Sequence, residues 1–413
     1  MNITKTTLFI TLCILLFACQ KKKGMIETIM HKSGRFEDVL ENAEKFRLQI
    51  IYTQIDRDQD NKASFKTYKY RVDKDQYFYP ASSIKLPMAA LALEKINDIQ
   101  LDNFTPFADM EIDSSYIGQT QVLTDSSSQS GKPSVGHYIK KVFLVSDNDA
   151  FNRLYEFVGQ HEANERLIKK GYDDIRITHR LSIPLTIEQN RHTNPMKFYN
   201  QGKLVYDQHA GYNNEEIKSD VPILIGNSYY MNDDNLVSKP MDFSYKNAIG
   251  MESLHKILLS IIFPENFTPV ERFNLTGNDY NFLYEYMSKY PRESYFPDYA
   301  SNYADGYCKF FVFGGTQNAM DNNIRIYNKV GEAYGFLIDI AYIVNFKEKI
   351  EFVLGAVIYV NENEILNDGN YQYDKIGYPF MRDLGQVFYD YEVKRPVKYN
   401  PDLSKYNWKL WAE

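Results

Sequence analysis

Two regions of the chain, one near each end, have the hydrophobic pattern of β-strands. Residues 47–55 (RLQIIYTQI) and 64–72 (SFKTYKYRV) are rich in β-branched and aromatic side chains and flank a polar turn, which predicts an antiparallel hairpin. Residues 323–328, 334–346 and 350–360 alternate or run apolar in the same way. The sequence therefore predicts strands in both its first and its last third.

Apolar residues recur at helical spacing in most of the chain between these strands. The pattern predicts helices over 34–46, 86–96, 134–144, 149–158, 162–170, 253–263, 279–289 and 379–389. Residues 196–244 are polar, rich in Asn and Tyr and only weakly periodic, so we interpret them as an insertion of loops and short elements.

These elements predict an α+β fold with two lobes. The first is an α/β lobe (34–81 and 311–395), in which one antiparallel sheet takes strands from both chain ends and is flanked by the terminal helices. The second is an all-α lobe (82–310) inserted between them, and residues 396–413 form a C-terminal tail. Active sites favour junctions between lobes, so we expect the chemistry there.

The N-terminus has the features of an export signal. Lys5 precedes an apolar run over 8–18 that is shorter than the about 20 residues needed to span a bilayer. The run ends in LFAC at Cys19, which resembles a bacterial lipobox. We expect a signal peptide over 1–18, lipidation of Cys19, a linker over 19–33, and an extracytoplasmic protein anchored to a bacterial membrane. Ordinary secretory cleavage and an uncleaved anchor are the alternatives.

Composition narrows the class of protein. The 413 residues include 47 basic and 54 acidic side chains, a formal net charge of −7, and 44% hydrophobic residues, which excludes a disordered chain and disfavours nucleic acid as a partner. Of three cysteines, Cys13 leaves with the signal peptide and Cys19 takes the lipid, so Cys308 is expected without a disulfide. No His, Cys, Asp and Glu set has metal-ligand spacing, so we expect neither a metal nor a cofactor. We also expect a monomer.

The first chemical motif is Ser82-x-x-Lys85, where the hairpin gives way to a helix. Residues i and i+3 share one helix face, so the two side chains meet. A serine hydroxyl is a poor nucleophile until a base takes its proton, and a lysine can do so when desolvation or a second cation lowers its pKa. A second Ser-x-x-Lys, Ser253 with Lys256, lies mid-helix and is interpreted as an amphipathic surface.

Two further motifs follow in the chain. Ser146-Asp147-Asn148 opens a helix, where these residue types are either an N-cap or a hydroxyl and an amide that serve a substrate. Lys329-Val330-Gly331 ends a strand. There the glycine lets a ligand approach the backbone and the lysine can supply positive charge to a carboxylate.

In this order and on these elements, the three motifs resemble the serine penicillin-recognising enzymes, and class A β-lactamases most closely. The likeness covers roughly residues 34–195 and 245–393. It implies Ser82 as the acylated nucleophile, with Lys85 either as its proton acceptor or as the hydrogen-bonding partner that lowers its barrier. It also implies that Ser146 transfers a proton to the leaving nitrogen, that Asn148 orients the acyl amide and that Lys329 supplies positive charge. Gly331 and Ala333 would bind substrate along the final hairpin. Backbone N–H groups of Ser82 and near Ala333 would form an oxyanion hole.

The sequence departs from the family pattern at two places. The middle of the third motif usually carries a hydroxyl, and Val330 lacks it, which removes one hydrogen bond to a substrate carboxylate. The family also has a glutamate on a loop after the second motif, which activates the water that deacylates the enzyme. The comparable loop here, 180–195, is shorter.

The identity of a deacylating base is therefore open. Glu188 is the only carboxylate between Ile175 and Tyr206, and it is the first candidate. Counting from Arg180 places the family's glutamate at Ser182, and counting from Asn190 places it at Thr186. His179 and His192 are the other titratable candidates.

Three functions remain in view. The first is a β-lactamase-like serine hydrolase that opens a β-lactam or related amide through an acyl-Ser82 intermediate. The second is a peptidoglycan DD-peptidase or penicillin-binding protein with slow deacylation. The third is a non-catalytic binding lipoprotein that retains the fold.

Overall fold

The computed structural model describes residues 23–231, 235–314, 316 and 320–410. The expected signal peptide over 1–18 and the expected lipidation site Cys19 lie outside the described residues.

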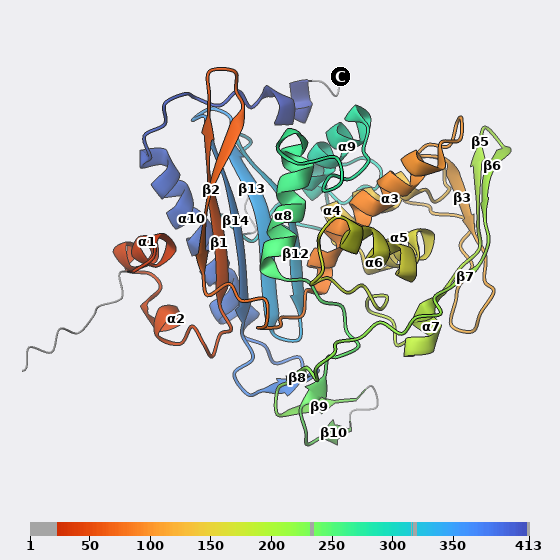
Figure 1. Ribbon diagram of the computed structural model, residues 1–413, viewed down its shortest axis with the longest axis horizontal. Coiled ribbons are helices and arrows are strands. Elements are labelled where there is room, and N and C mark those ends of the chain that lie inside the picture. The colour runs from red at the N-terminus through yellow and green to blue at the C-terminus, as the bar shows by residue number, and fades with distance from the viewer. Residues whose placement is uncertain (1–22, 232–234, 315, 317–319, 411–413) are drawn as a thin grey trace, which may run out of the picture.

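A five-stranded antiparallel sheet forms the centre of the molecule, in the order β12-β13-β14-β1-β2. Its strands are β1 (Gln49–Arg57), β2 (Ala63–Tyr70), β12 (Ile324–Ala333), β13 (Phe336–Asn345) and β14 (Ile350–Tyr359). Helices cover both faces (Figure 1). The α+β class, with one sheet built from both ends of the chain, is confirmed.

The two faces of the sheet bury two separate hydrophobic clusters. Along β13, Ile338, Ile340 and Tyr342 belong to the cluster on the helical-lobe side, where α8 (Met251–Ile262) packs. The alternate residues Leu337 and Ala341 belong to the cluster on the opposite side. Successive strand residues point to opposite faces, so a strand covered on both sides reads as a continuous apolar run.

The opposite face is covered by helices from the two ends of the chain. Met25–Ser33 forms helix α1, which packs on α10 (Tyr378–Lys394), and α2 (Glu37–Glu41) follows it. The expected linker over 19–33 is therefore wrong from Met25 onward, and the helix expected over 34–46 is confined to α2. The spacing of the buried residues Ile26, Ile29 and Met30 explains α1, because i, i+3 and i+4 share one helix face.

The second lobe lies on the other side of α8 (Figure 1). Its helices are α3 (Lys85–Ile99), α4 (Val135–Leu144), α5 (Asn148–Val158), α6 (Gln160–Lys169), α7 (Ile187–Arg191) and α9 (Gly277–Ser288). Short helical turns are η1 (Ala81–Ile84), η2 (Pro264–Asn266), η3 (Pro291–Glu293), η4 (Tyr373–Gly377), η5 (Ser404–Tyr406) and η6 (Trp408–Leu410). Helix α3 is buried along most of its length, which makes it the axis of this lobe.

The expectation of an all-α second lobe is wrong, because the lobe carries a three-stranded sheet. Strand β5 (Met196–Asn200) pairs with β3 (Asp109–Ile112) and with β6 (Lys203–Gln208). Residues 196–244 also contain loops and the short strands β7 (Gly211–Tyr212), β8 (Leu224–Ile225), β9 (Ser228–Tyr230), β10 (Leu236–Val237) and β11 (Met241–Asp242). Strand β4 (His192–Thr193) lies just before this region. Strand β15 (Ile365–Leu366), from the segment after β14, pairs with β9.

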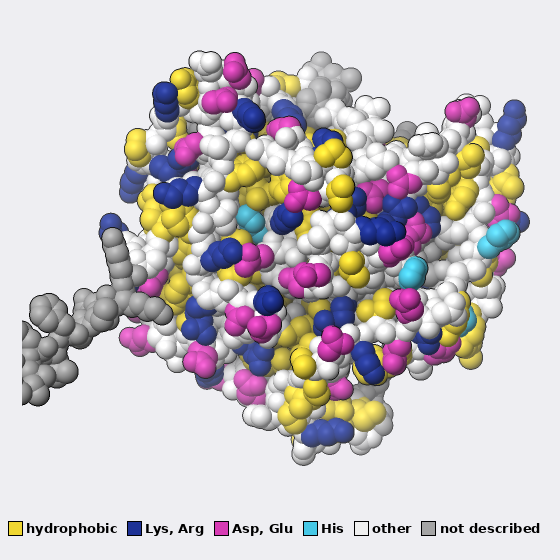
Figure 2. Space-filling model, in the orientation of Figure 1, with side chains coloured by type: hydrophobic (Ala, Val, Ile, Leu, Met, Phe, Trp, Pro, Cys, Tyr) yellow, Lys and Arg dark blue, Asp and Glu magenta, His cyan; other side chains and the backbone are white. Residues whose placement is uncertain are grey.

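Within the described residues, every helix is too short or too polar to cross a lipid bilayer. Figure 2 shows Lys and Arg side chains interleaved with Asp and Glu over the visible face. The charges on this face are therefore mixed in sign.

Candidate active site

The Ser82 side chain lies at the start of α3, on the turn η1. Ala81, the residue before it, has φ of +47°, a left-handed conformation that is unfavourable for a non-glycine residue. The hydroxyl of the next serine, Ser83, is buried and donates to the carbonyl of Pro80 (2.7 Å). Ser82 is instead partly exposed and lines two cavities. The strained turn thus presents one serine and buries its neighbour.

Lys85, one helical turn further on, is fully buried. Its Nζ donates to the carbonyl of Ser146, to Asn148 Oδ1 (2.7 Å) and to Ser146 Oγ (3.3 Å). Burial first, and the neighbouring Lys329 ammonium second, hold the pKa of Lys85 well below its ordinary value. A lowered pKa makes the neutral amine, which can accept a proton, more accessible than in an exposed lysine.

Ser146 connects the two lysines. Lys329, on β12, donates from Nζ to Ser146 Oγ (2.8 Å) and to the carbonyl of Val330 (3.0 Å). Burial lowers the pKa of Lys329 to about 8. Of the three residues of this motif, Asp147 is the N-cap of α5, because its carboxylate accepts a hydrogen bond from the Ala150 N–H (2.8 Å). The Ser146 hydroxyl is therefore left to the lysines.

Gly331 brings strand β12 against the turn that carries Ser82. A Cβ atom at this position would lie 2.5 Å from the Pro80 carbonyl oxygen and 3.1 Å from the Ser83 nitrogen. The group that approaches the glycine is thus the protein's own backbone, where we had expected a ligand. Strand β12 continues past the motif to Ala333, which lines a cavity together with Ser82.

Two cavities meet at Ser82. One of about 580 Å³ is also lined by Ser146, and one of about 620 Å³ is also lined by Ala333. Both include Asn148 and Glu332. A carbonyl group of a substrate can therefore approach the Ser82 hydroxyl from a space that the motif residues surround.

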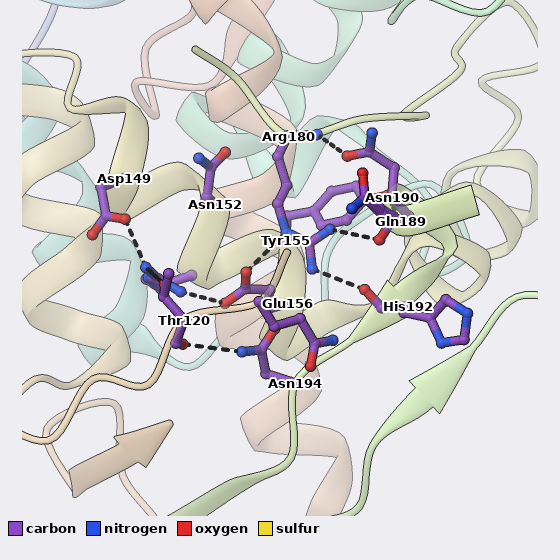
Figure 3. A network of polar contacts seen from close by, with 12 residues as sticks. Thr120, Asp149, Asn152, Tyr155, Glu156, Arg180, Gln189, Asn190, His192 and Asn194 are labelled. Carbon is purple, nitrogen blue, oxygen red and sulfur yellow. Dashed lines mark hydrogen bonds and ion pairs between the residues drawn. The ribbon is translucent and has the colours of Figure 1, made fainter. Parts of the chain in front are cut away.

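The loop after α6 is clamped onto the helical lobe by buried polar contacts (Figure 3). Arg180 binds Glu156 (2.8 Å) and the carbonyl of His192 (2.8 Å). The Asn152 amide forms two hydrogen bonds with the backbone of Leu181 (2.8 and 3.0 Å). These contacts fix the two ends of the loop and the backbone just before residue 182.

Ser182 is the loop residue that reaches the site. Asn148 Nδ2 donates to Ser182 Oγ (2.8 Å), and Ser182 has φ of +54°. Of the two positions obtained by aligning the loop with the family pattern, Ser182, counted from Arg180, therefore lies at the site. Thr186, counted from Asn190, caps α7 instead. Glu188 is exposed and binds Arg191 (3.0 Å) and His192 (3.3 Å), so the structure does not bring it to Ser82.

The two histidines, His179 and His192, also lie apart from Ser82. His179 stacks on Tyr79, and burial together with Lys246 lowers its pKa to about 4. His192 stacks on Tyr116 with 3.6 Å between ring centroids. Neither lines the two cavities that contain Ser82.

The sequence reasoning missed two features of this site. Glu332 lines both cavities, and its only sequence signal is its position directly after the third motif. Asn152 and Arg180 hold the loop, but nothing local in the sequence predicts that clamp. In the part of the chain that the structure describes, no group of three His, Cys, Asp or Glu side chains is arranged to hold a metal ion.

Comparisons with known proteins find a family model whose matched residues include the first two motifs. A family model described as the beta-lactamase enzyme family matches residues 33–217, which confirms the resemblance to β-lactamase-like serine hydrolases. Similar solved structures include a β-lactamase from Burkholderia vietnamiensis (12% identity, 91% of this chain and 100% of that chain, TM-score 0.48). Another is a β-lactamase from Francisella tularensis (15% identity, 86% and 95%, TM-score 0.47). A third is a class A β-lactamase from Clostridium kluyveri (12% identity, 88% and 98%, TM-score 0.45). No curated relative matches the sequence.

Proposed function

We propose that this β-lactamase-like protein cleaves a strained or activated amide through an acyl-enzyme on Ser82. The observation that carries the proposal is the amine of Lys85. It is buried beside a second lysine, bonded to Ser146 and Asn148, and one helical turn from a serine that faces a cavity. Desolvation and a nearby cation are the two means by which a lysine becomes a base.

These contacts support the following acylation step. Neutral Lys85 accepts the proton of the Ser82 hydroxyl while Ser82 Oγ forms a bond to the substrate carbonyl carbon. The oxyanion is stabilised by N–H groups of Ser82 and near Ala333, each worth about 2.7–4 kcal/mol. As the carbon–nitrogen bond breaks, the proton passes from Lys85 through the Ser146 hydroxyl to the leaving nitrogen, and Asn148 orients the acyl amide. Burial and, after it, the positive charge of Lys329 lower the pKa of Lys85 and so favour its neutral form.

The residue found where a deacylating base is expected favours a second candidate function. This is an enzyme of DD-peptidase or penicillin-binding type that releases its acyl group slowly. The supporting observation is Ser182, whose hydroxyl accepts the Asn148 amide where the β-lactamase pattern has a carboxylate. A serine is too weak a base to activate water at neutral pH. We therefore propose that the acyl-enzyme persists once formed.

The compartment proposed from the N-terminal signal suits either candidate. A lipid-anchored protein on the extracytoplasmic side of a bacterial membrane meets β-lactams and peptidoglycan-derived peptides as its substrates. We propose this location together with lipidation of Cys19.

Intact-mass spectrometry after mixing with a penicillin tests the proposal. We expect one covalent adduct on the wild-type protein and none on Ser82→Ala, whose acylation should fall by about 10³–10⁶-fold. Ser253→Ala removes the other Ser-x-x-Lys serine, on α8, and should acquire the adduct normally. A persistent adduct favours the slow enzyme, and rapid return to the free mass favours the β-lactamase.

Two results would contradict the proposal. An adduct that forms as fast on Ser82→Ala as on the wild type would exclude Ser82 as the nucleophile. Absence of any adduct on the folded wild-type protein, with penicillin or a fluorophosphonate, would favour a non-catalytic binding protein.

A further inference from the structure

One wall of the cavity that contains Ser82 and Ser146 is acidic and aromatic. Glu332 and Asp374 contribute the carboxylates to this cavity of about 580 Å³. Its aromatic lining residues are Tyr303, Tyr307, Phe310 and Tyr378. We refer to Glu332, Asp374, Tyr303, Tyr307 and Tyr378 as the acidic subsite.

The two carboxylates of the acidic subsite have no basic partner in the part of the chain that the structure describes. Glu332 directly follows Gly331 on β12 and accepts a hydrogen bond from the Tyr378 hydroxyl, while Asp374 lies on the turn η4 before α10. Both are exposed, and among the described residues neither forms an ion pair with a lysine, arginine or histidine. Partial desolvation and the charge of Asp374 raise the pKa of Glu332, as expected for a carboxylate that no cation compensates.

The tyrosines add a second electronegative surface to the same wall. The rings of Tyr303 and Tyr307 are in contact, with 4.6 Å between centroids, and the ring of Tyr378 packs edge-on against Phe310. Aromatic faces attract cations through their quadrupole, and tyrosines beside carboxylates form a surface suited to an ammonium or guanidinium group. The thiol of Cys308, 5% exposed, also lines this cavity and has no hydrogen-bond partner among the described residues.

The lysine beside this cavity is buried. Lys329 is the lysine that could hold a substrate carboxylate, but it is 2% exposed and its Nζ already donates to Ser146 and to the Val330 carbonyl. Val330 contributes no hydroxyl. A carboxylate placed here would instead meet Glu332 and Asp374.

We propose that the acidic subsite binds a cationic group of the substrate, so that the amides acylating Ser82 fastest carry an ammonium or guanidinium near the scissile bond. This inference rests on the proposed function, because the subsite and Ser82 share one cavity. It names a substrate class that differs from the carboxylate-bearing penicillins.

Three activated monocyclic β-lactams test the inference. They share one ring and differ only at the end of the ring-nitrogen substituent, which is an ammonium, an acetamide or a carboxylate. We measure the second-order rate constant of Ser82 acylation by intact mass at low and high salt. An exposed ion pair contributes up to about 1 kcal/mol, which is about a fivefold change in rate constant. Two carboxylates should therefore make acylation by the ammonium reagent about 10–25-fold faster than acylation by the acetamide. Added salt should reduce this preference.

Variants assign the preference to the subsite. Glu332→Gln and Asp374→Asn should each reduce the ratio of ammonium to acetamide rates by about fivefold. Asp60→Asn, in the exposed β1–β2 turn, removes the same charge and should leave the ratio unchanged. A ratio that changes equally in Asp60→Asn would assign the effect to net charge and overturn the subsite.

The remaining outcomes separate this inference from the proposed function. If all three reagents acylate Ser82 at similar rates, or if the ratio survives in both subsite variants, the acidic subsite is refuted and the acyl-enzyme stands. If no reagent acylates Ser82 in the folded protein, the proposed function fails and the inference fails with it.

Discussion

Replacing Gly331 by alanine tests whether the close approach of β12 to the Ser82 turn positions the nucleophile. The new Cβ would lie 2.5 Å from the Pro80 oxygen and 3.1 Å from the Ser83 nitrogen, and these two atoms bracket Ser82. Both are backbone atoms, and the Pro80 oxygen is held by the N–H (3.0 Å) and the hydroxyl (2.7 Å) of Ser83. The clash therefore cannot be relieved by rotation of a side chain.

The size of the effect follows from the overlap. Carbon and oxygen pack at roughly 3.3 Å or more, so the turn must move by about 0.8 Å relative to the strand. Overpacking of this kind costs about 1–3 kcal/mol of unfolding free energy. A displacement approaching 1 Å at a reacting group costs up to about 10²-fold in rate. We therefore expect Gly331→Ala to acylate Ser82 about 10–100-fold more slowly and to unfold at a lower temperature.

Acylation followed by intact mass, with thermal unfolding in parallel, measures both effects. Gly277→Ala is the matched control, because a Cβ at this first residue of α9 meets no atom within 4 Å. It should acylate at the wild-type rate and be as stable or slightly more stable, since alanine is the better helix former. If Gly331→Ala acylated as fast as Gly277→Ala, the strand–turn contact would not position the nucleophile.

Two further predictions concern the loop and the lysine pair. Ser182→Glu should shorten the lifetime of the acyl-enzyme by at least about tenfold, measured by the decay of the adduct mass, because a positioned general base accelerates a reaction by about 10²–10⁴-fold. Ser182→Ala is the control. An unchanged lifetime in both variants would show that this position does not govern deacylation. The acylation rate should fall on the acid side as Lys85 gains its proton and on the alkaline side as Lys329 loses its proton near pH 8. In Lys329→Met the acid limb should move to higher pH, because removing the neighbouring cation raises the pKa of Lys85; a limb that stayed in place or moved to lower pH would contradict the coupling.

Local patterns in the sequence determined much of the architecture. The alternating segments became β1, β2, β13 and β14, because period-2 burial belongs to a strand whatever it packs against. The spacing of Ser82 and Lys85 likewise depends only on helix geometry. The motif order then led to the β-lactamase resemblance, which the family model confirms over residues 33–217.

Elements that depend on distant partners were predicted less well. Helix α1 was expected to be a linker, since its three buried residues gain stability only by packing against the rest of the α/β lobe. Strand β5 was expected within an insertion, and it becomes a strand through its pairing with β3. Short segments of this kind take their structure from tertiary contacts more than from intrinsic propensity.

The candidate site divides in the same way. The sequence by itself predicted the candidate residues Ser82, Lys85, Ser146, Asn148 and Lys329, because they stand in three recognisable motifs. Only the tertiary structure decided which residue of the shortened loop reaches Asn148. The contacts of Arg180 and Asn152 with the helical lobe place Ser182 there, and Glu188 points to solvent. The physical reason is that the path of a loop is set by long-range hydrogen bonds at its ends, which no local pattern records.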